Sequence, residues 1–206
     1  WLVFNHRNAT SEAIKRGFDL SVSFVMLMFA WPFMLLAVLA IWLEDGMGAP
    51  VIFKQVRVGQ NGRNYEVAKF RSMRIDAEKD GKARWATSDD DRITRVGRFI
   101  RKTRIDELPQ ILNVISGDMS LVGPRPERPE FVRELREEIP FYDRRHMVKP
   151  GVTGWAQMNY PYGASVQDAK NKLEYDLYYA KSRSLFLDCL ILLQTVEVIL
   201  FGKGAR

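Results

Sequence analysis

The segment that most constrains this chain is an uncharged apolar run from Leu20 to Leu43, in which Ser21 and Ser23 are the only hydroxyl side chains. A helix of this length would extend roughly 36 Å, enough to cross the hydrocarbon core of a bilayer. The run is too long for a signal peptide and has no cleavage pattern. We therefore predict that it forms a membrane helix.

A proline stands near the middle of this segment, and Pro32 removes a backbone hydrogen bond there. Basic residues lie on both flanks, with Lys15 and Arg16 before the segment and Lys54 and Arg57 after it. Basic flanks are typical of the cytoplasmic side. A helix that enters the membrane, bends and returns to the same face satisfies both flanks. On sequence alone, a kinked span and a re-entrant helix are equally good interpretations.

The overall charge indicates an anionic partner. The net charge is +6 and the pI is near 9.5, which suits nucleic acid, acidic lipid or a phosphorylated substrate. The single cysteine, Cys189, excludes an internal disulfide and favours a reducing compartment. Only two histidines occur, which argues against a zinc site. Because the sequence begins at Trp1, we expect it to be a segment of a longer protein.

The rest of the chain predicts an α+β domain that is mainly helical. Two β-rich stretches, 51–58 and 65–70, flank the turn signal Gly59–Gly62, so we predict a small β-hairpin. Helices are predicted over residues 94–102, 108–115, 129–138, 168–179 and 184–201. The last is apolar but contains Asp188, which argues against a span. An amphipathic helix in the membrane interface, or packed on the domain, fits better.

Two adjacent carboxylates, Asp106 and Glu107, stand just before Pro109. Proline is tolerated only in the first turn of a helix, so the two acids lie at a helix N-terminus, the positive end of its dipole. From these residues alone, a helix cap is the simpler interpretation. Successive helical residues point about 100° apart, so the two acids would take different positions.

Arginines surround this acidic pair. From Arg92 to Arg101 an arginine recurs every third residue, which indicates a solvated helix face that also suits lipid headgroups. Arg101 and Arg104 lie closest to the two acids and are candidate phosphate ligands. Arg125 stands between two prolines that hold its backbone extended, as a rigid phosphate clamp would require. A simple surface turn is an equally good interpretation of that tripeptide.

Three further features bear on a site. The loop 149–157 has two glycines and several donors, and such loops can cradle phosphates. Asp176 shares a helix face with Leu173 and Leu177, so we predict that it points inward and needs an arginine or a metal as partner. The basic residues of the hairpin, Lys69 among them, either form a solvated face or line an anionic site.

Together these motifs resemble the bacterial sugar transferases that act on polyprenyl phosphate, the monotopic phosphoglycosyl transferases. The matching pieces occur in the family's order and cover nearly the whole chain after Ile14. They are the proline-broken apolar segment, VIFKQ (51–55), KFRSM (69–73), RIDELPQ (104–110), NVISGDMSLVGPRP (113–126), KPGVTGWAQ (149–157) and EYDLYY (174–179). No single piece decides the resemblance, but the ordered set is highly specific.

The resemblance implies an enzyme on the cytoplasmic face of the inner membrane. Such enzymes move sugar 1-phosphate from a UDP-sugar to undecaprenyl phosphate and release UMP, in two steps through a phosphosugar held on an aspartate, with Mg²⁺ assisting. The family's catalytic pair falls on Asp106 and Glu107, which would also hold the metal. Arg101 and Arg125 match phosphate-binding arginines, and Asp176 matches a further functional carboxylate.

Roles follow from this match. We predict that Asp106 attacks the β-phosphate. Glu107 would complete the metal and phosphate site, or act as a base toward the lipid phosphate. Lys69, Trp155 and Gln157 lie in the matching motifs and are predicted to support the site.

The resemblance also implies an organisation. A basic lead-in (1–19) would precede a re-entrant membrane helix (20–43) and a cytoplasmic catalytic domain (44–206) that ends in an interfacial helix. The family's membrane break is commonly Ser-Pro, whereas Trp31 precedes the proline here. The stretch 159–164 looks more like the larger members that begin exopolysaccharides, and we expect it to line the sugar pocket. A homo-oligomer is compatible with upstream domains, although nothing in the sequence requires one.

The alternative is a membrane-anchored basic module that binds acidic lipid or nucleic acid without catalysis. It predicts no special role for Asp106 or Glu107, and it leaves the proline-clamped Arg125 unexplained. The resemblance favours the transferase, whose partners would be a UDP-sugar, undecaprenyl phosphate and membrane lipids, and not nucleic acid.

Overall fold

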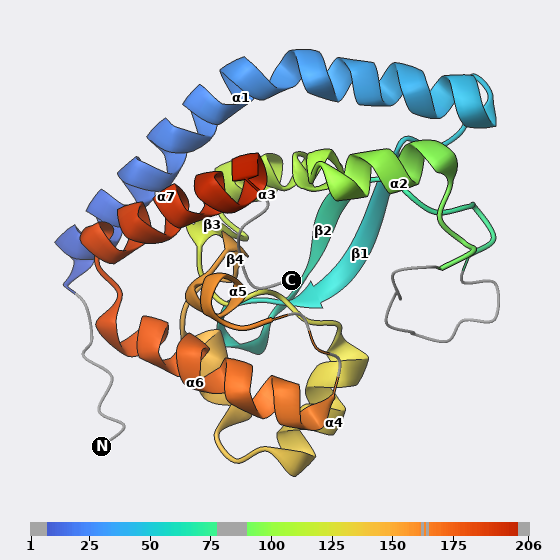
Figure 1. Ribbon diagram of the computed structural model, residues 1–206. Helices are drawn as coiled ribbons and strands as arrows, with labels where there is room; N and C mark the ends of the chain where they lie inside the picture. Colours follow the sequence, from blue (N-terminus) through green and yellow to red (C-terminus); the bar gives the residue numbers. More distant parts are fainter. Residues whose placement is uncertain (1–7, 78–89, 162, 164, 202–206) are drawn as a thin grey trace.

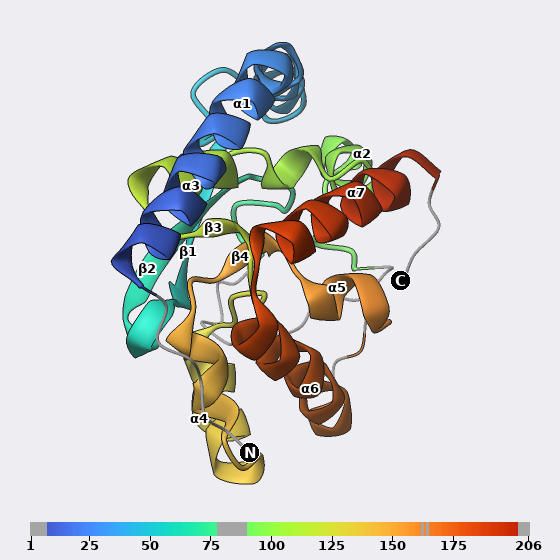
Figure 2. The same cartoon turned by 90° about the vertical axis from the view of Figure 1, so that its left-hand side faces the viewer.

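The computed structural model describes residues 8–77, 90–161, 163 and 165–201, and it is a mixed, mostly helical structure (Figure 1). In chain order its elements are α1 (Ala9–Asp45), β1 (Ile52–Val58), η1 (Gln60–Gly62), β2 (Asn64–Phe70), α2 (Arg95–Lys102), η2 (Ile105–Glu107), α3 (Gln110–Ser116), β3 (Ser120–Val122), α4 (Pro129–Glu138), η3 (Tyr142–Met147), β4 (Gly151–Thr153), α5 (Trp155–Asn159), α6 (Val166–Ser182) and α7 (Leu185–Phe201). In both views α1 lies over α2, α3 and α7, with α4 and α6 on the opposite side (Figures 1 and 2).

The apolar segment forms one helix, α1, which continues through Pro32. Figure 1 shows that α1 bends near its middle, as expected where a proline removes a backbone hydrogen bond. Within the described residues it is the one helix long and apolar enough to cross a membrane. Large apolar side chains such as Phe29, Trp31 and Leu36 are more than half exposed on it. An apolar surface of this extent on one helix fits association with a membrane.

Both ends of α1 are fastened to the same domain. Near its start, the Arg16 guanidinium donates hydrogen bonds to the Val114 and Ile115 carbonyls of α3, at 2.5 and 2.7 Å. At its end, the Glu44 carboxylate accepts from the Arg95 and Val96 N–H groups of α2, at 2.8 and 3.0 Å. A cation at one helix C-terminus and an acid at another's N-terminus both complement helix dipoles.

A buried charge network also joins α1 to the C-terminal helices. Lys15 Nζ lies 2.9 Å from Asp19 and 3.0 Å from Asp188 of α7, and it donates to Ser120 Oγ at 2.7 Å. The Tyr179 hydroxyl donates to Asp188 at 2.7 Å. These partners offset the cost of burying the two carboxylates. Asp188 therefore packs α7 against the domain.

The predicted hairpin is confirmed. Strands β1 and β2 pair antiparallel in a register that runs from Ile52↔Phe70 to Val58↔Asn64. The turn between them places Asn61 and Gly62 at φ of 55° and 75°, the left-handed region that these residue types tolerate best.

The loop 149–157 contains strand β4, which pairs parallel with β3. Strand β3 ends at Val122, shortly before Arg125 in the chain. A Cβ on Gly151 would lie 2.1 Å from the Gly123 nitrogen, so only glycines allow the two backbones to come this close. The Gly151 N–H already donates to the Pro124 carbonyl at 3.0 Å. Gly123 and Gly151 therefore hold two backbone segments together, and the Gly151 N–H is already used within the fold.

Candidate active site

Asp106 lies in the short helix η2, between α2 and α3, and its side chain is buried. Its Oδ1 atom is shielded from solvent and, within the described residues, has no hydrogen-bond partner. The Arg104 backbone just before it is left-handed, with φ of 60°, which costs about 1–2 kcal/mol for a residue with a side chain. This turn ends α2 and redirects the chain into η2. Backbone strain beside a buried, unpartnered carboxylate is typical of functional sites.

Glu107 is held by two cations from distant parts of the chain. Its Oε1 atom accepts from Lys69 Nζ at the end of β2 and from Arg125 Nη2 after β3, each at 2.8 Å. The contacts cross 38 and 18 residues of sequence. Hydrogen bonds between charged partners are short and strong, so Glu107 fixes the positions of both cations.

The two neighbouring acids have opposite pKa shifts. Burial, reinforced by the negative charge of Glu107, raises the pKa of Asp106 to about 6, although Lys69, Arg101 and Arg104 oppose the shift. Burial would also raise the pKa of Glu107, but Arg125 and Lys69 hold it well below its usual range. Divergent pKa values in adjacent carboxylates assign them different tasks. At neutral pH Glu107 is a permanent anion, and Asp106 is a more basic, more nucleophilic carboxylate.

Arg101 and Arg104 lie near enough to lower the pKa of Asp106. In the part of the chain that the structure describes, neither forms an ion pair with Asp106 or Glu107. With Lys69 and Arg125 they make four cations around two carboxylates. This surplus of positive charge suits a substrate with several phosphate charges.

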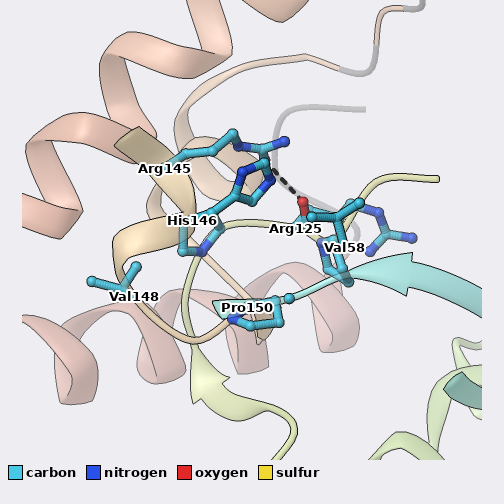
Figure 3. Close-up of a pocket in the computed structure, with 9 residues that line it drawn as sticks. Val58, Arg125, Arg145, His146, Val148 and Pro150 are labelled. Carbon is cyan, nitrogen blue, oxygen red and sulfur yellow. Dashed lines mark hydrogen bonds between the residues drawn. The ribbon is translucent and has the colours of Figure 1, made fainter. Parts of the chain in front are cut away.

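The backbone of Arg125 is fixed by a buried ion pair. Arg145 donates from Nη2 to the Arg125 carbonyl at 2.8 Å, and its Nε lies 2.9 Å from the Asp176 carboxylate. Its Nη1 donates to the Tyr142 hydroxyl at 2.8 Å. Figure 3 shows the bond to Arg125 beside a small pocket that Val58 also lines. The proline-flanked arginine is thus held both by its own backbone restriction and by a buried guanidinium.

Among the described residues no three His, Cys, Asp or Glu side chains gather as metal ligands, so a magnesium ion here would depend on substrate phosphates as well as on Asp106. Mg²⁺ is usually bound by one or two carboxylates together with substrate phosphates. The Oδ1 atom of Asp106, which has no hydrogen-bond partner within the described residues, could serve as one such ligand. Glu107 is less available, because its Oε1 atom already faces two cations.

Comparison with known proteins identifies the family. The family model described as "Bacterial sugar transferase" matches residues 10–202, nearly the whole chain. The chain belongs to the bacterial sugar transferase family.

Within that family, three relatives show the range of similarity. The UDP-N-acetylgalactosamine-undecaprenyl-phosphate N-acetylgalactosaminephosphotransferase of Aeromonas hydrophila is 49% identical over 94% of this chain and 45% of its own length. The undecaprenyl-phosphate glucose phosphotransferase of Komagataeibacter xylinus is 43% identical over 93% of this chain and 36% of its own length. The exopolysaccharide production protein PSS of Rhizobium leguminosarum is 41% identical over 93% of this chain and 98% of its own length. The chain thus spans less than half of the first two relatives.

Two of the predicted supporting residues lie away from the acids. Trp155 and Gln157 belong to α5, where Trp155 packs against Tyr178 of α6 with ring centroids 6.1 Å apart. Gln157 donates to the Val152 carbonyl, and within the described residues neither bonds to Asp106 or Glu107. The expected sugar loop, 159–164, includes residues 162 and 164, which lie outside the described residues.

Sequence reasoning missed Arg145. It predicted that Asp176 points inward and needs an arginine or a metal, and Asp176 is buried against an arginine. The segment 142–147 offers two adjacent arginines, and only the tertiary contact selects between them. Asp176 therefore acts on the site indirectly, through Arg145 and the backbone of Arg125.

Proposed function

We propose that this family member transfers sugar 1-phosphate from a UDP-sugar to undecaprenyl phosphate and releases UMP. The observation that carries the proposal is a buried carboxylate, Asp106, with an unpartnered oxygen among cations on a membrane-associated domain. The name of the Aeromonas hydrophila relative contains both undecaprenyl phosphate and a UDP-linked sugar, which supports the same substrates. Such a step would begin exopolysaccharide or other glycoconjugate assembly.

The reaction would proceed in two displacements at one phosphorus. An Asp106 oxygen attacks the β-phosphorus of the UDP-sugar, and the bond from that phosphorus to the bridging oxygen breaks as UMP leaves. An oxygen of the lipid phosphate then attacks the same phosphorus and expels Asp106, which leaves the sugar on a lipid diphosphate. Lys69, Arg101, Arg104 and Arg125 are placed to offset the negative charge that otherwise opposes both attacks.

The roles of the two acids differ under this proposal. Glu107 is a poor base, because its pKa is held well below its usual range and its Oε1 atom faces two cations. Its task would be to orient Lys69 and Arg125. Bound Mg²⁺, held by Asp106 and the substrate phosphates, would supply further neutralisation of phosphate charge.

The membrane geometry supports access from one face. Both ends of α1 bond to the same domain, whereas the ends of a simple span would be separated by the bilayer. We propose a re-entrant α1 inserted from the cytoplasmic face of the inner membrane. Exposed apolar residues of α7, including Phe186 and Leu193, would rest in the interface, where α2 presents Arg95 and Arg98 to lipid headgroups.

Assay of UMP release tests the proposal. The intact protein in nanodiscs is given undecaprenyl phosphate, Mg²⁺ and a panel of UDP-sugars, and we expect release with at least one sugar. Asp106→Asn should abolish release, whereas Asp118→Asn, which neutralises an exposed carboxylate, should preserve it. Without acceptor lipid, the wild type should gain the mass of one sugar phosphate on the peptide that contains Asp106.

Two results would oppose the proposal in different ways. Wild-type release rates in Asp106→Asn would show that the nucleophile is another group. No release with any UDP-sugar, together with binding to acidic vesicles, would favour a non-catalytic basic module.

A further inference from the structure

Asn113 is a buried residue in the middle of α3 whose side-chain oxygen and nitrogen are both hydrogen-bonded. Its Oδ1 atom accepts from the Ala68 N–H at 3.0 Å, and its Nδ2 atom donates to the Glu66 carbonyl at 2.8 Å. Both partners are backbone groups of β2. An amide that both donates to and accepts from one strand imitates the edge of a neighbouring strand.

The strand offers this edge because β1 covers only its other side. The N–H of Arg71, just past β2, donates to the Val51 carbonyl of the β1 side, so odd-numbered residues turn their backbone groups toward β1. Glu66 and Ala68 are even-numbered and turn theirs outward. Asn113 therefore pins α3 to the open edge of β2 in one register.

This register bears on the active site. Lys69 directly follows Ala68 on β2, and Glu107 lies in η2, which leads into α3. The Lys69–Glu107 ion pair, 2.8 Å long, thus joins β2 to the short helix η2, directly before the helix that Asn113 ties to the same strand. Apart from these polar contacts, the elements meet through apolar packing of Val67 against the cluster that contains Val114. Apolar packing is not directional and would tolerate a small slip.

We propose that Asn113 is a positioning residue for the active site, which sets the β2–α3 register so that Lys69 reaches Glu107. Its effect on the placement of Lys69 depends on the fold alone. Its effect on turnover rests on the proposed function. The two consequences can therefore be measured separately.

The first measurement is the rate at which acetic anhydride acetylates the Lys69 amine of the folded protein in detergent, followed by mass spectrometry of the peptide that contains Lys69. We expect Asn113→Ser to speed acylation roughly tenfold, the factor expected for loss of one hydrogen bond to a charged group. Asn113→Asp keeps the side-chain volume and one acceptor but sets a carboxylate against the Glu66 carbonyl, and it should act similarly. Val132→Ala, a cavity in the remote core of α4, controls for general destabilisation and should leave the rate unchanged.

The second measurement is a double-mutant cycle on kcat/KM for UMP release. Asn113→Ser should lower kcat/KM on the order of tenfold to a hundredfold in the wild type, as misplacement of an active-site group does. In a Lys69→Met background the same change should have little further effect. Unchanged Lys69 acylation in both Asn113 variants would overturn the proposal, even if no UDP-sugar supports turnover. Equal losses in the two backgrounds would also overturn it, because Asn113 would then act elsewhere.

Discussion

Replacement of Asp106 by asparagine should make the protein more stable while it removes activity. In the folded state the pKa of Asp106 is about 6, against an ordinary value of 3.8. The shift corresponds to about 3 kcal/mol of destabilisation once the carboxylate is ionised, since each pKa unit is worth about 1.4 kcal/mol. Asparagine has nearly the same shape and carries no charge, so it removes this penalty.

The stabilisation expected from Asp106→Asn increases with pH. Because the folded-state pKa is raised, the folded state binds more protons than the unfolded chain between pH 3.8 and about 6. The penalty is therefore fully present above about pH 6 and declines as pH falls toward 3.8. Asp106→Asn should stabilise the protein by about 3 kcal/mol at pH 8, by about half of that near pH 5, and by less than about 1 kcal/mol at pH 4.

Thermal melting of the purified protein in detergent measures this effect. For a chain of this size, about 3 kcal/mol corresponds to a rise of roughly 6–12 °C at pH 8. Glu107→Gln provides the matched contrast, because its carboxylate is stabilised by Lys69 and Arg125 and its loss should destabilise by roughly 2–3 kcal/mol. Asp91→Asn, at an exposed position, should shift melting by less than roughly 2 °C. An Asp106→Asn protein that melts no higher than wild type at pH 8, or whose gain is the same at pH 4, would refute the reasoning.

Three further predictions concern activity and topology. The rate of UMP release should fall about tenfold per pH unit below an apparent pKa near 6, because Asp106 must be ionised to attack; a profile without that acid limb between pH 5 and 7 would contradict this. Arg145→Gln should raise KM for the UDP-sugar about tenfold. Arg145→Lys should restore little, because lysine lacks the planar guanidinium that bonds to both Asp176 and the Arg125 carbonyl. An unchanged KM would show that the loop that contains Arg125 needs no support from Arg145. The topology can be tested in a Cys189→Ser background with single cysteines at the exposed positions Gly17 and Met47. Both cysteines should resist a membrane-impermeant maleimide in intact cells and react after the cells are disrupted. Labelling of either cysteine from outside would establish a span.

Local features of the chain predicted most of the elements. The hairpin follows from β-rich stretches around the turn Gly59–Gly62, and α4 occupies the predicted residues 129–138. The helix predicted from 94 to 102 forms as α2, with Thr94 as its cap. The acids were expected at the N-terminus of the next helix, and they lie directly before it, in the separate short helix η2, with Pro109 at the start of α3. Periodicity, turn residues and prolines act over a few neighbouring residues, so sequence alone can identify these features.

By itself, the sequence determined the apolar helix, the order of the elements and the adjacency of Asp106 and Glu107, because each depends on residues close together in the chain. Only the tertiary structure decided which distant cations meet Glu107, that Arg145 is the partner of Asp176, and that both ends of α1 return to one domain. The two acids differ for the same reason. Their identities are local, but their pKa values depend on burial and on charges brought from β2 and from the loop after β3, which only the folded chain assembles.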